Sequence, residues 1–316
     1  MKYSIGVAVV TYKDSRHLEK CLPPLLASPL KPKVLVFNSS SNDGTVELAK
    51  KLGAKTLVIP RTEMNHGWAR EISRKTLGTD IVVMMTPDAY AESDMLEKLV
   101  KPIIEGKADI AYARQIAHDG ANIISRFGRE FNFPEKSNVR SIKDASKYGV
   151  YTAFCSDACT AWKNSTLDEI GGFRWVLSGE DAVAAALILK KGYKIAYVAD
   201  AVVHHSHNYT PLKEFVRHFD TGMYRRQWHK VLDLGGGSDQ KRGASYAQAL
   251  LAYVLKNEPL MFPTAFLQLA MGWLGYHFGW LCYHIAPLWL YKAISPADFF
   301  WNSTGYKEGR WFEEAK

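Results

Sequence analysis

The chain has 316 residues, of which 47% are hydrophobic and 23% are charged, a balance typical of globular proteins that excludes disorder. It carries 40 Lys and Arg against 32 Asp and Glu, a net charge of +8 that suits an anionic partner such as a phosphorylated substrate or an acidic lipid surface. No nucleic-acid partner is expected, because zinc-finger spacing and RNA-binding motifs are absent from the sequence. Cys155 and Cys159 lack a second Cys or His pair nearby, which disfavours a zinc site, and the scattered cysteines fit a reducing cytoplasm.

The first 115 residues alternate short apolar runs with amphipathic stretches. Strands are predicted over 5–12, 34–40, 54–60, 80–89 and 108–115, and helices over 14–28, 41–53, 65–78 and 93–106. Strands separated by helices of this length imply an α/β fold with a doubly wound, mostly parallel sheet. Ligands of such sheets bind at the carboxyl ends of the strands, where this sequence places Thr11, Tyr12, Asn38, Ser39, Thr86 and Asp88.

The second half has weaker signals at first and then becomes helical. Residues 115–150 are expected to be loop with short helices, followed by helices over 164–173 and 178–193 and a strand over 194–207. Residues 210–232 predict a basic amphipathic helix, whose apolar side packs on the core or contacts a membrane surface. Residues 235–243 predict a flexible link to the last helices. We therefore expect two regions, 1–210 and 211–316.

Two segments bear on membrane contact. The N-terminus becomes polar too soon for a signal peptide. Residues 259–291 contain no Asp, Glu, Lys or Arg and are long enough to cross a bilayer, but Pro263, Pro287 and several polar residues interrupt them. Interfacial or protein-packed helices are therefore favoured over a spanning helix.

The stretch SGEDAVAAAL, residues 178–187, predicts the start of a helix. Ser178 can cap it, and Glu180 and Asp181 suit the positive end of the helix dipole. The alternative is that Asp181 is a catalytic base kept ionised by the same dipole, which would make it a base of moderate strength. The stretch alone leaves both interpretations open.

Asp88 and the histidines after the last predicted strand are candidate metal ligands. Asp88 follows the buried run VVMMT and either begins a turn or holds a divalent metal on a diphosphate. Among His204, His205 and His207, either all are satisfied by the backbone or one imidazole joins Asp88 at the metal. Arg70 follows a glycine at a helix start and either reaches a phosphate or is an ordinary surface arginine.

An ordered set of short motifs carries a family resemblance. The segments AVVTYKD, VFNSSSNDGT, MNHGWAR, MTPDA, ARQ, FCSDACTAW, IGGF, GED and VVHHSHNYT, spread over about residues 4–225, resemble family 2 glycosyltransferases, and most of all their bacterial rhamnosyltransferase branch. The resemblance implies a GT-A fold, a nucleotide-diphosphate sugar donor, Mg²⁺ or Mn²⁺, and inversion at the anomeric carbon. It also implies a GT-A catalytic domain over 1–210 and a helical C-terminal region over 211–316 that contacts the membrane or the acceptor.

The family's roles fall on individual residues of this chain. The resemblance implies that Asp181 is the general base with Glu180 beside it, and that Asp88 and His205 bind the metal. It implies that the nucleotide sugar is contacted by Thr11, Tyr12, Asn38, Arg70, Asp88 and Arg114. Two features depart from the family: Asn38 replaces the usual acid, and Trp68 and Ala69 replace glycine and threonine near the donor.

These expectations define an inverting, metal-dependent glycosyltransferase at the cytoplasmic face of the inner membrane, active in surface polysaccharide synthesis. The expected donor is dTDP-L-rhamnose and the expected acceptor a lipid-linked saccharide. A UDP-sugar donor remains an alternative, as does a non-catalytic sugar-nucleotide-binding subunit, which Asn38 favours and Asp88 and Asp181 disfavour. A nucleotidyltransferase would want a glycine-rich basic signature that AVVTYKDSRH lacks. The sequence leaves the oligomeric state open.

Overall fold

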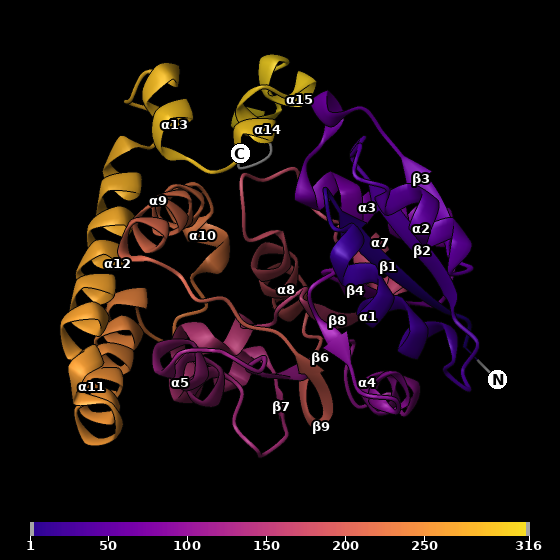
Figure 1. Cartoon of the computed structure of the whole chain (residues 1–316), viewed down its shortest axis with the longest axis horizontal. Coiled ribbons are helices and arrows are strands. Elements are labelled where there is room, and N and C mark those ends of the chain that lie inside the picture. Colours follow the sequence, from indigo (N-terminus) through magenta and orange to yellow (C-terminus); the bar gives the residue numbers. More distant parts are fainter. Residues whose placement is uncertain (1–2, 314–316) are drawn as a thin grey trace.

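The computed structural model describes residues 3–313 and contains one nine-stranded sheet (Figure 1). The order of its main path is β3-β2-β1-β4-β8-β6-β9-β5, and β7 pairs with β9 off this path. The strands are β1 (Ile5–Thr11), β2 (Lys33–Asn38), β3 (Lys55–Val58), β4 (Ile81–Met85), β5 (Tyr90–Ala91), β6 (Ile110–Ile116), β7 (Asn138–Arg140), β8 (Cys159–Lys163) and β9 (Ile195–His204).

The sheet is parallel in its N-terminal half and mixed beyond it. Strands β3, β2, β1 and β4 are parallel as predicted, and β6 is parallel to β9, but β8 is antiparallel to both β4 and β6. The segment between β6 and β8 makes no crossover, so β8 begins at the edge where β4 and β6 end. As a result, the residues just before β8 lie at the same edge as Asp88.

Helices cover both faces of the sheet because side chains alternate along each strand. Val7 and Val9 of β1 pack with α1 (Ser15–Leu26), α2 (Thr45–Lys51) and α4 (Met95–Ile104). Ala8 faces the other way, toward the core formed with α3 (His66–Leu77), α7 (Asn164–Glu169) and α8 (Glu180–Lys190). Helix α5 (Ile123–Asn132) lies in the segment that was expected to contain short helices.

The C-terminal region is helical, as predicted. Its longer helices are α9 (Pro211–Gln227), α11 (Asp239–Asn257) and α12 (Phe262–Cys282), and the shorter ones are α10 (His229–Leu232), α13 (Leu288–Ile294), α14 (Asp298–Trp301), α15 (Thr304–Lys307) and α16 (Arg310–Glu313). Tyr224, Trp228 and Leu232 pack into the same core as α8, so the two predicted regions share buried residues. The boundary at 210 remains a prediction.

Glycines let α9 and α12 approach until their backbones touch. A Cβ atom on Gly275 or Gly279 would lie 2.2 or 2.0 Å from a carbonyl oxygen of α9, and one on Gly222 would lie 2.0 Å from the carbonyl of Tyr276. The apolar side of the predicted basic helix, including Phe219 and Met223, is therefore buried against protein. Among residues 3–313, no helix combines the length and the apolar character needed to cross a bilayer.

Two local predictions are wrong. Ser178 does not cap α8: Gly179 occupies the cap position with φ of 75°, and no side chain accepts a bond there. A side chain at this position would also meet the Tyr224 ring, 2.5 Å from an added Cβ, so packing as well as conformation requires glycine. The flexible link is shorter than expected, because Ser238 caps α11 by accepting from the Lys241 N–H.

Candidate active site

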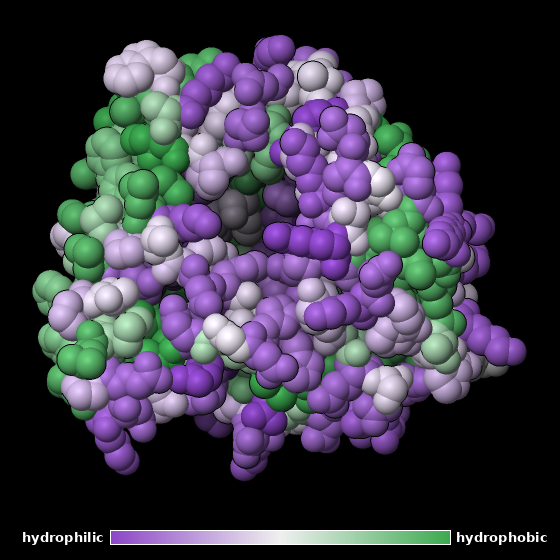
Figure 2. Space-filling model, viewed as in Figure 1, coloured by the Kyte–Doolittle hydropathy of each residue, from purple (hydrophilic) through white to green (hydrophobic). Residues whose placement is uncertain are grey.

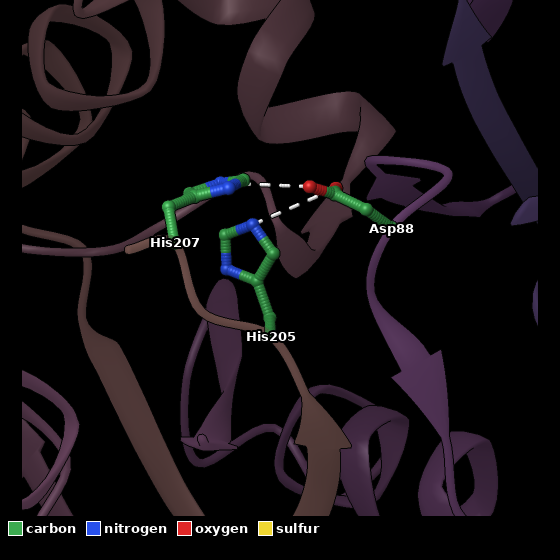
Figure 3. A group of neighbouring side chains, drawn as sticks. All are labelled: Asp88, His205 and His207. Atoms are coloured by element: carbon green, nitrogen blue, oxygen red, sulfur yellow. Dashed lines mark ion pairs between the residues drawn. The ribbon is translucent and has the colours of Figure 1, made fainter. Parts of the chain in front are cut away.

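Asp88, His205 and His207 converge at the carboxyl edge of the sheet and are called here the Asp88 cluster (Figure 3). Nε2 of His205 lies 3.5 Å from Oδ1 of Asp88, and Nε2 of His207 lies 3.5 Å from its Oδ2. One ligand atom from each residue falls within 4.8 Å of the others. Asp88 follows β4 and the histidines follow β9, so the strand ends assemble the group.

A hydrogen-bonded glutamine fixes the tautomer of His205. The amide nitrogen of Gln115 donates to Oγ of Ser156 at 2.9 Å, which directs Oε1 toward Nδ1 of His205, also at 2.9 Å. Oε1 further accepts from Arg129. Because this oxygen can only accept, Nδ1 of neutral His205 carries the proton, and Nε2 presents its lone pair to the Asp88 cluster.

The electrostatics of the cluster suit a divalent cation. Burial alone would raise the pKa of Asp88, but its interactions with His205, Thr86 and His207 hold that pKa well below the usual range. Burial lowers the pKa of His207 to about 4, and neighbouring His205 adds to the effect. At neutral pH the cluster therefore offers a carboxylate and the neutral imidazole of His207, and such oxygen and nitrogen donors can bind a divalent cation.

Arg70, Asp157, Glu180 and Asp181 form a second group, called here the Arg70 cluster. Nε of Arg70 lies 2.6 Å from Oδ2 of Asp157, and Nη1 lies 2.5 Å from Oε1 of Glu180. These three side chains are buried, whereas Asp181 is partly exposed. Of the two adjacent acids in α8, Glu180 therefore points inward to an arginine, and Asp181 is the one that a substrate can reach.

The Asp181 carboxylate is held by two backbone groups. Its Oδ2 accepts from the Asp157 N–H at 3.2 Å, and its Oδ1 accepts from the Ala182 N–H at 2.7 Å. Burial and, next, the charge of Glu180 raise the pKa of Asp181, whereas Arg70 and the two backbone bonds lower it, and the net change is upward. Asp181 is therefore a stronger base than the helix dipole alone predicted.

The two clusters belong to one edge and are joined by short contacts. Ser156, which accepts from Gln115, directly precedes Asp157, whose N–H donates to Asp181. The contacts run in order through Asp88, His205, Gln115, Ser156, Asp157 and Asp181. The candidate cation ligands and the candidate base therefore share one edge of the sheet. Figure 2 shows a hollow near the centre of the face in view.

A third group of candidate site residues lies at the carboxyl ends of β1 and β2. Asn38 is fully buried and donates to Oγ1 of Thr11 at 3.0 Å and to Oγ of Ser41 at 2.9 Å, so these residues hold the strand ends together. Tyr12 is 36% exposed, and the guanidinium of Arg61 lies 3.7 Å from its ring centroid. The Arg61 guanidinium also faces the Phe299 ring at 4.7 Å, so Tyr12 and Arg61 form an aromatic and cationic pair at these strand ends.

The structure brings together most of the predicted site residues, with two exceptions of placement. Arg114 lies outside the site: it lines an open cavity of about 890 Å³ bordered by α4, β7 and β9, and its Nη2 donates to Glu135 at 2.9 Å. Arg70 lies in the site, but its guanidinium contacts carboxylates of the protein. Gly67, at the start of α3, packs against the protein's own backbone, since an added Cβ would lie 1.8 Å from the Arg174 carbonyl oxygen.

Sequence reasoning gave no site role to three contributors, Arg61, Gln115 and Asp157, and it named His207 only as one of three candidate histidines. The position of Gln115 next to Arg114 offered a signal, because neighbouring strand residues face opposite sides of a sheet. His207 belonged to a recognised histidine cluster. Asp157 lies in the segment FCSDACTAW that carries the family resemblance, but its place in the site depends on the reversed direction of β8 and could not be predicted.

The fold, with candidate cation ligands and an accessible carboxylate at the carboxyl edge of the sheet, fits the class of α/β transferases that act on nucleotide-linked groups. Residues 6–171 match the family described as glycosyl transferase family 2. The chain belongs to this family, and it is a glycosyltransferase with the GT-A fold.

Curated relatives match nearly the whole chain. The chain is 35% identical over 313 residues to the O-antigen chain rhamnosyltransferase RfbN of Salmonella typhimurium, covering 97% of this chain and 98% of the relative. It is 32% identical to the O-antigen chain rhamnosyltransferase WbaN of Salmonella anatum, covering 88% and 89%.

Solved structures share the fold at low sequence identity. The mannosyltransferase PcManGT from Pyrobaculum calidifontis, in complex with GDP-Man and Mn²⁺, aligns with a TM-score of 0.54 at 18% identity, covering 85% of this chain and 74% of that one. S. aureus TarS 1–349 in complex with UDP-GlcNAc aligns with a TM-score of 0.52 at 15% identity, covering 97% and 92%.

Proposed function

We propose that this protein transfers L-rhamnose from dTDP-L-rhamnose, with inversion, to a lipid-linked or growing saccharide of a bacterial surface glycan. The observation that carries the proposal is the contact path joining Asp88, His205 and Gln115 to Asp157 and Asp181, which sets a cation site and a base at one sheet edge. The names of the two O-antigen relatives support the sugar and the pathway class.

The chemistry requires one base and a stabilised leaving group. Asp181 removes the proton from the acceptor hydroxyl, and that oxygen attacks the anomeric carbon from the face opposite the diphosphate. The bond to the diphosphate oxygen breaks as the new bond forms, and its electron pair leaves with the nucleoside diphosphate. A cation held by Asp88, His205 and His207, Mg²⁺ or Mn²⁺, would supply positive charge for the diphosphate.

In this proposal the nucleotide of the donor binds at the carboxyl ends of β1 and β2. Tyr12 and Arg61 offer the base a stacking surface, and the hydroxyl of Ser39 accepts from Arg61 Nη1 at 2.9 Å. Thr11 and Asn38 hold the strand ends beneath it, and the Asn38 amide does so without a carboxylate. The neutral side chain at position 38 is therefore compatible with donor binding.

The test is a donor screen with the full chain and Mn²⁺ or Mg²⁺, measuring nucleoside diphosphate release and sugar transfer to bacterial lipid extract. We expect turnover with dTDP-L-rhamnose, and a loss of about 10²–10⁴-fold in Asp181→Asn with its thermal unfolding unchanged. Turnover that survives in Asp181→Asn would sink the base assignment. Tight dTDP binding without turnover of any donor would instead favour a non-catalytic subunit, and turnover with a UDP-sugar alone would replace the donor.

We further propose that the protein lies at the cytoplasmic face of the inner membrane through the outer side of α12. Large apolar side chains are exposed on α12 and on the segments just before and after it: Phe266, Leu267, Trp273, Leu274 and Leu281 on α12, and Leu260, Ile285 and Trp289 next to it. Figure 2 shows apolar residues gathered along the side that carries α11 and α12. Exposed Lys256 and Lys292 flank this surface and complement anionic lipid.

Flotation with vesicles containing phosphatidylglycerol tests this surface. The double variant Trp273→Ser, Leu281→Ser removes two aromatic or aliphatic anchors and should weaken vesicle binding by about tenfold or more. The matched control is Val58→Ser, Val139→Ser, because those valines are 47% and 48% exposed but lie in the sheet region. Equal flotation of the two double variants would contradict the proposal.

A further inference from the structure

Arg70 occupies a position that the transfer chemistry does not explain by itself. It is 6% exposed, and its guanidinium joins three separate parts of the chain: α3, the segment just before β8 and the first residue of α8. Asp157 is further fixed because its Oδ1 accepts from the Trp162 indole N–H at 2.9 Å. Arg70 is therefore committed to the protein's own carboxylates.

The two partners of Arg70 are also the two residues that determine where Asp181 lies. Glu180 immediately precedes Asp181 at the start of α8, and the Asp157 N–H donates to the Asp181 carboxylate. A guanidinium that binds both partners in fixed directions sets their separation, because its donors lie in one rigid plane. Asn65 supports the same segment from α3, donating to the Val176 carbonyl at 2.7 Å.

We propose that the buried Asp157–Arg70–Glu180 triad is a positioning unit that orients the Asp181 carboxylate and tunes its basicity. The inference rests on the proposed role of Asp181 as the base. It assigns Arg70 to the base rather than to the donor phosphates, where the family resemblance had placed it. Arg70, Asp157 and Glu180 do not touch the reacting atoms, so they are positioning residues.

The charges around Asp181 give the proposal a signed consequence. Glu180 disfavours the ionised form of Asp181, and Arg70 favours it. The other titratable groups that face Asp181 come from the segment before β8, from α3 and from α9, and they are Asp157, Cys155, His66 and Tyr224. Burial lowers the pKa of His66 and raises those of Cys155 and Tyr224, so these three are neutral at pH 7 and leave Arg70 as the cation of the group.

The decisive experiment is the pH profile of kcat for nucleoside diphosphate release from dTDP-L-rhamnose by the full chain. Activity requires ionised Asp181, and burial raises the pKa of neighbouring Asp157 as well, so the acidic limb of the profile reports the titration of these two carboxyls together. Glu180→Gln removes a negative charge and should move this limb to lower pH, while Arg70→Met removes a positive charge and should move it to higher pH, each by about one unit. Misplacement of the base should also lower the maximal kcat, by about 10²-fold in Arg70→Met.

Arg70→Lys and calorimetry with dTDP complete the design. Arg70→Lys keeps the charge but loses the planar fork, so kcat should fall while the acidic limb stays close to that of the unchanged protein. All three variants should bind dTDP in the presence of Mn²⁺ as the unchanged protein does. If Arg70→Met fails to fold, the Glu180→Gln shift and the Arg70→Lys profile decide.

Three results would overturn the proposal. A loss of dTDP affinity in Arg70→Lys with an unmoved acidic limb would return Arg70 to the donor phosphates. Reduced thermal stability with no change in kcat or its pH profile would leave the triad as a structural ion pair. A shift of Glu180→Gln to higher pH would contradict the sign. An active Asp181→Asn protein would fail the proposed function instead, which keeps the two outcomes apart.

Discussion

The Asp88 cluster and the Arg70 cluster lie at one sheet edge but handle charge in opposite ways. In the Arg70 cluster a guanidinium inside the protein compensates buried carboxylates at 2.5 and 2.6 Å. In the Asp88 cluster a carboxylate faces imidazoles at 3.5 Å, and the glutamine behind His205 directs a lone pair inward. One cluster carries its own cation, whereas the other has the donors for a cation supplied from outside.

The largest effect is expected from removing the metal that the Asp88 cluster is proposed to bind. Chelation with EDTA should remove the charge that stabilises the leaving diphosphate. The activation free energy should rise by about 4 kcal/mol, which lowers turnover by about three orders of magnitude. Adding Mn²⁺ or Mg²⁺ should restore it. Full activity after chelation, with metal absence verified by elemental analysis, would show that the Asp88 cluster works without a cation.

A smaller effect on metal binding is expected when the residue that orients His205 is replaced. Gln115→Leu removes the acceptor of the Nδ1 proton, so the imidazole loses its fixed direction and Mn²⁺ should bind about 10–100-fold more weakly. Isothermal calorimetry with Mn²⁺ alone measures this. Ser156→Ala is the matched control, because it removes the other end of the Gln115 contact and leaves the Nδ1 acceptor in place. Equal Mn²⁺ affinity in both variants and the unchanged protein would contradict the assigned tautomer.

Asp220 contrasts with the carboxylates of the Arg70 cluster, because it is a buried carboxylate for which the described residues show no cation partner. It accepts from the Ser295 hydroxyl at 2.9 Å, and burial raises its pKa to about 7. Its raised pKa contributes stability at low pH that is lost as pH rises toward 7. Asp220→Asn should therefore be stabilised relative to the unchanged protein by a margin that grows by about 2 kcal/mol from pH 5 to pH 7 and then levels off.

Chemical denaturation at pH 5, 6, 7 and 8 measures that margin. Ser295→Ala serves as the control, because it removes the hydrogen bond and should lower stability more at pH 8, where Asp220 is ionised, than at pH 5. A margin for Asp220→Asn that is constant across this range would show that Asp220 does not titrate within it.

The smallest effect is expected for Arg114→Ala. Arg114 pairs with Glu135, whose side chain is 86% exposed, so stability should change by less than about 1 kcal/mol. Affinity for dTDP should not change, because the side chain lies in the cavity beside α4 and not at the sheet edge. Weaker dTDP binding in this variant would support the donor contact that the family resemblance implied.

Local pattern was enough to predict six of the strands, β1, β2, β3, β4, β6 and β9, and the polar residues that follow them, whereas β5, β7 and β8 were not predicted. Asp88 was found because it follows a buried apolar run, and Asp181 because it stands at the start of a predicted helix, and the family resemblance supplied their roles. The direction of β8 was not predictable, since it depends on the path of the segment after β6. The position of Asp157, just before β8, was therefore not predictable either. The same limit applies to Arg70, because only the folded chain shows that its partners are Asp157 and Glu180.

The glycine contacts between α9 and α12 fix a distance as well as a packing arrangement. Helix α12 carries the apolar outer surface, α9 touches its backbone through Gly275 and Gly279, and Tyr224 of α9 lies against Gly179 at the start of α8. A continuous path of close contacts thus joins the proposed lipid-facing surface to Asp181. If α12 lies on the bilayer as proposed, the height of Asp181 above the headgroups would be constant, and that height would select which sugar along a lipid-anchored glycan is extended.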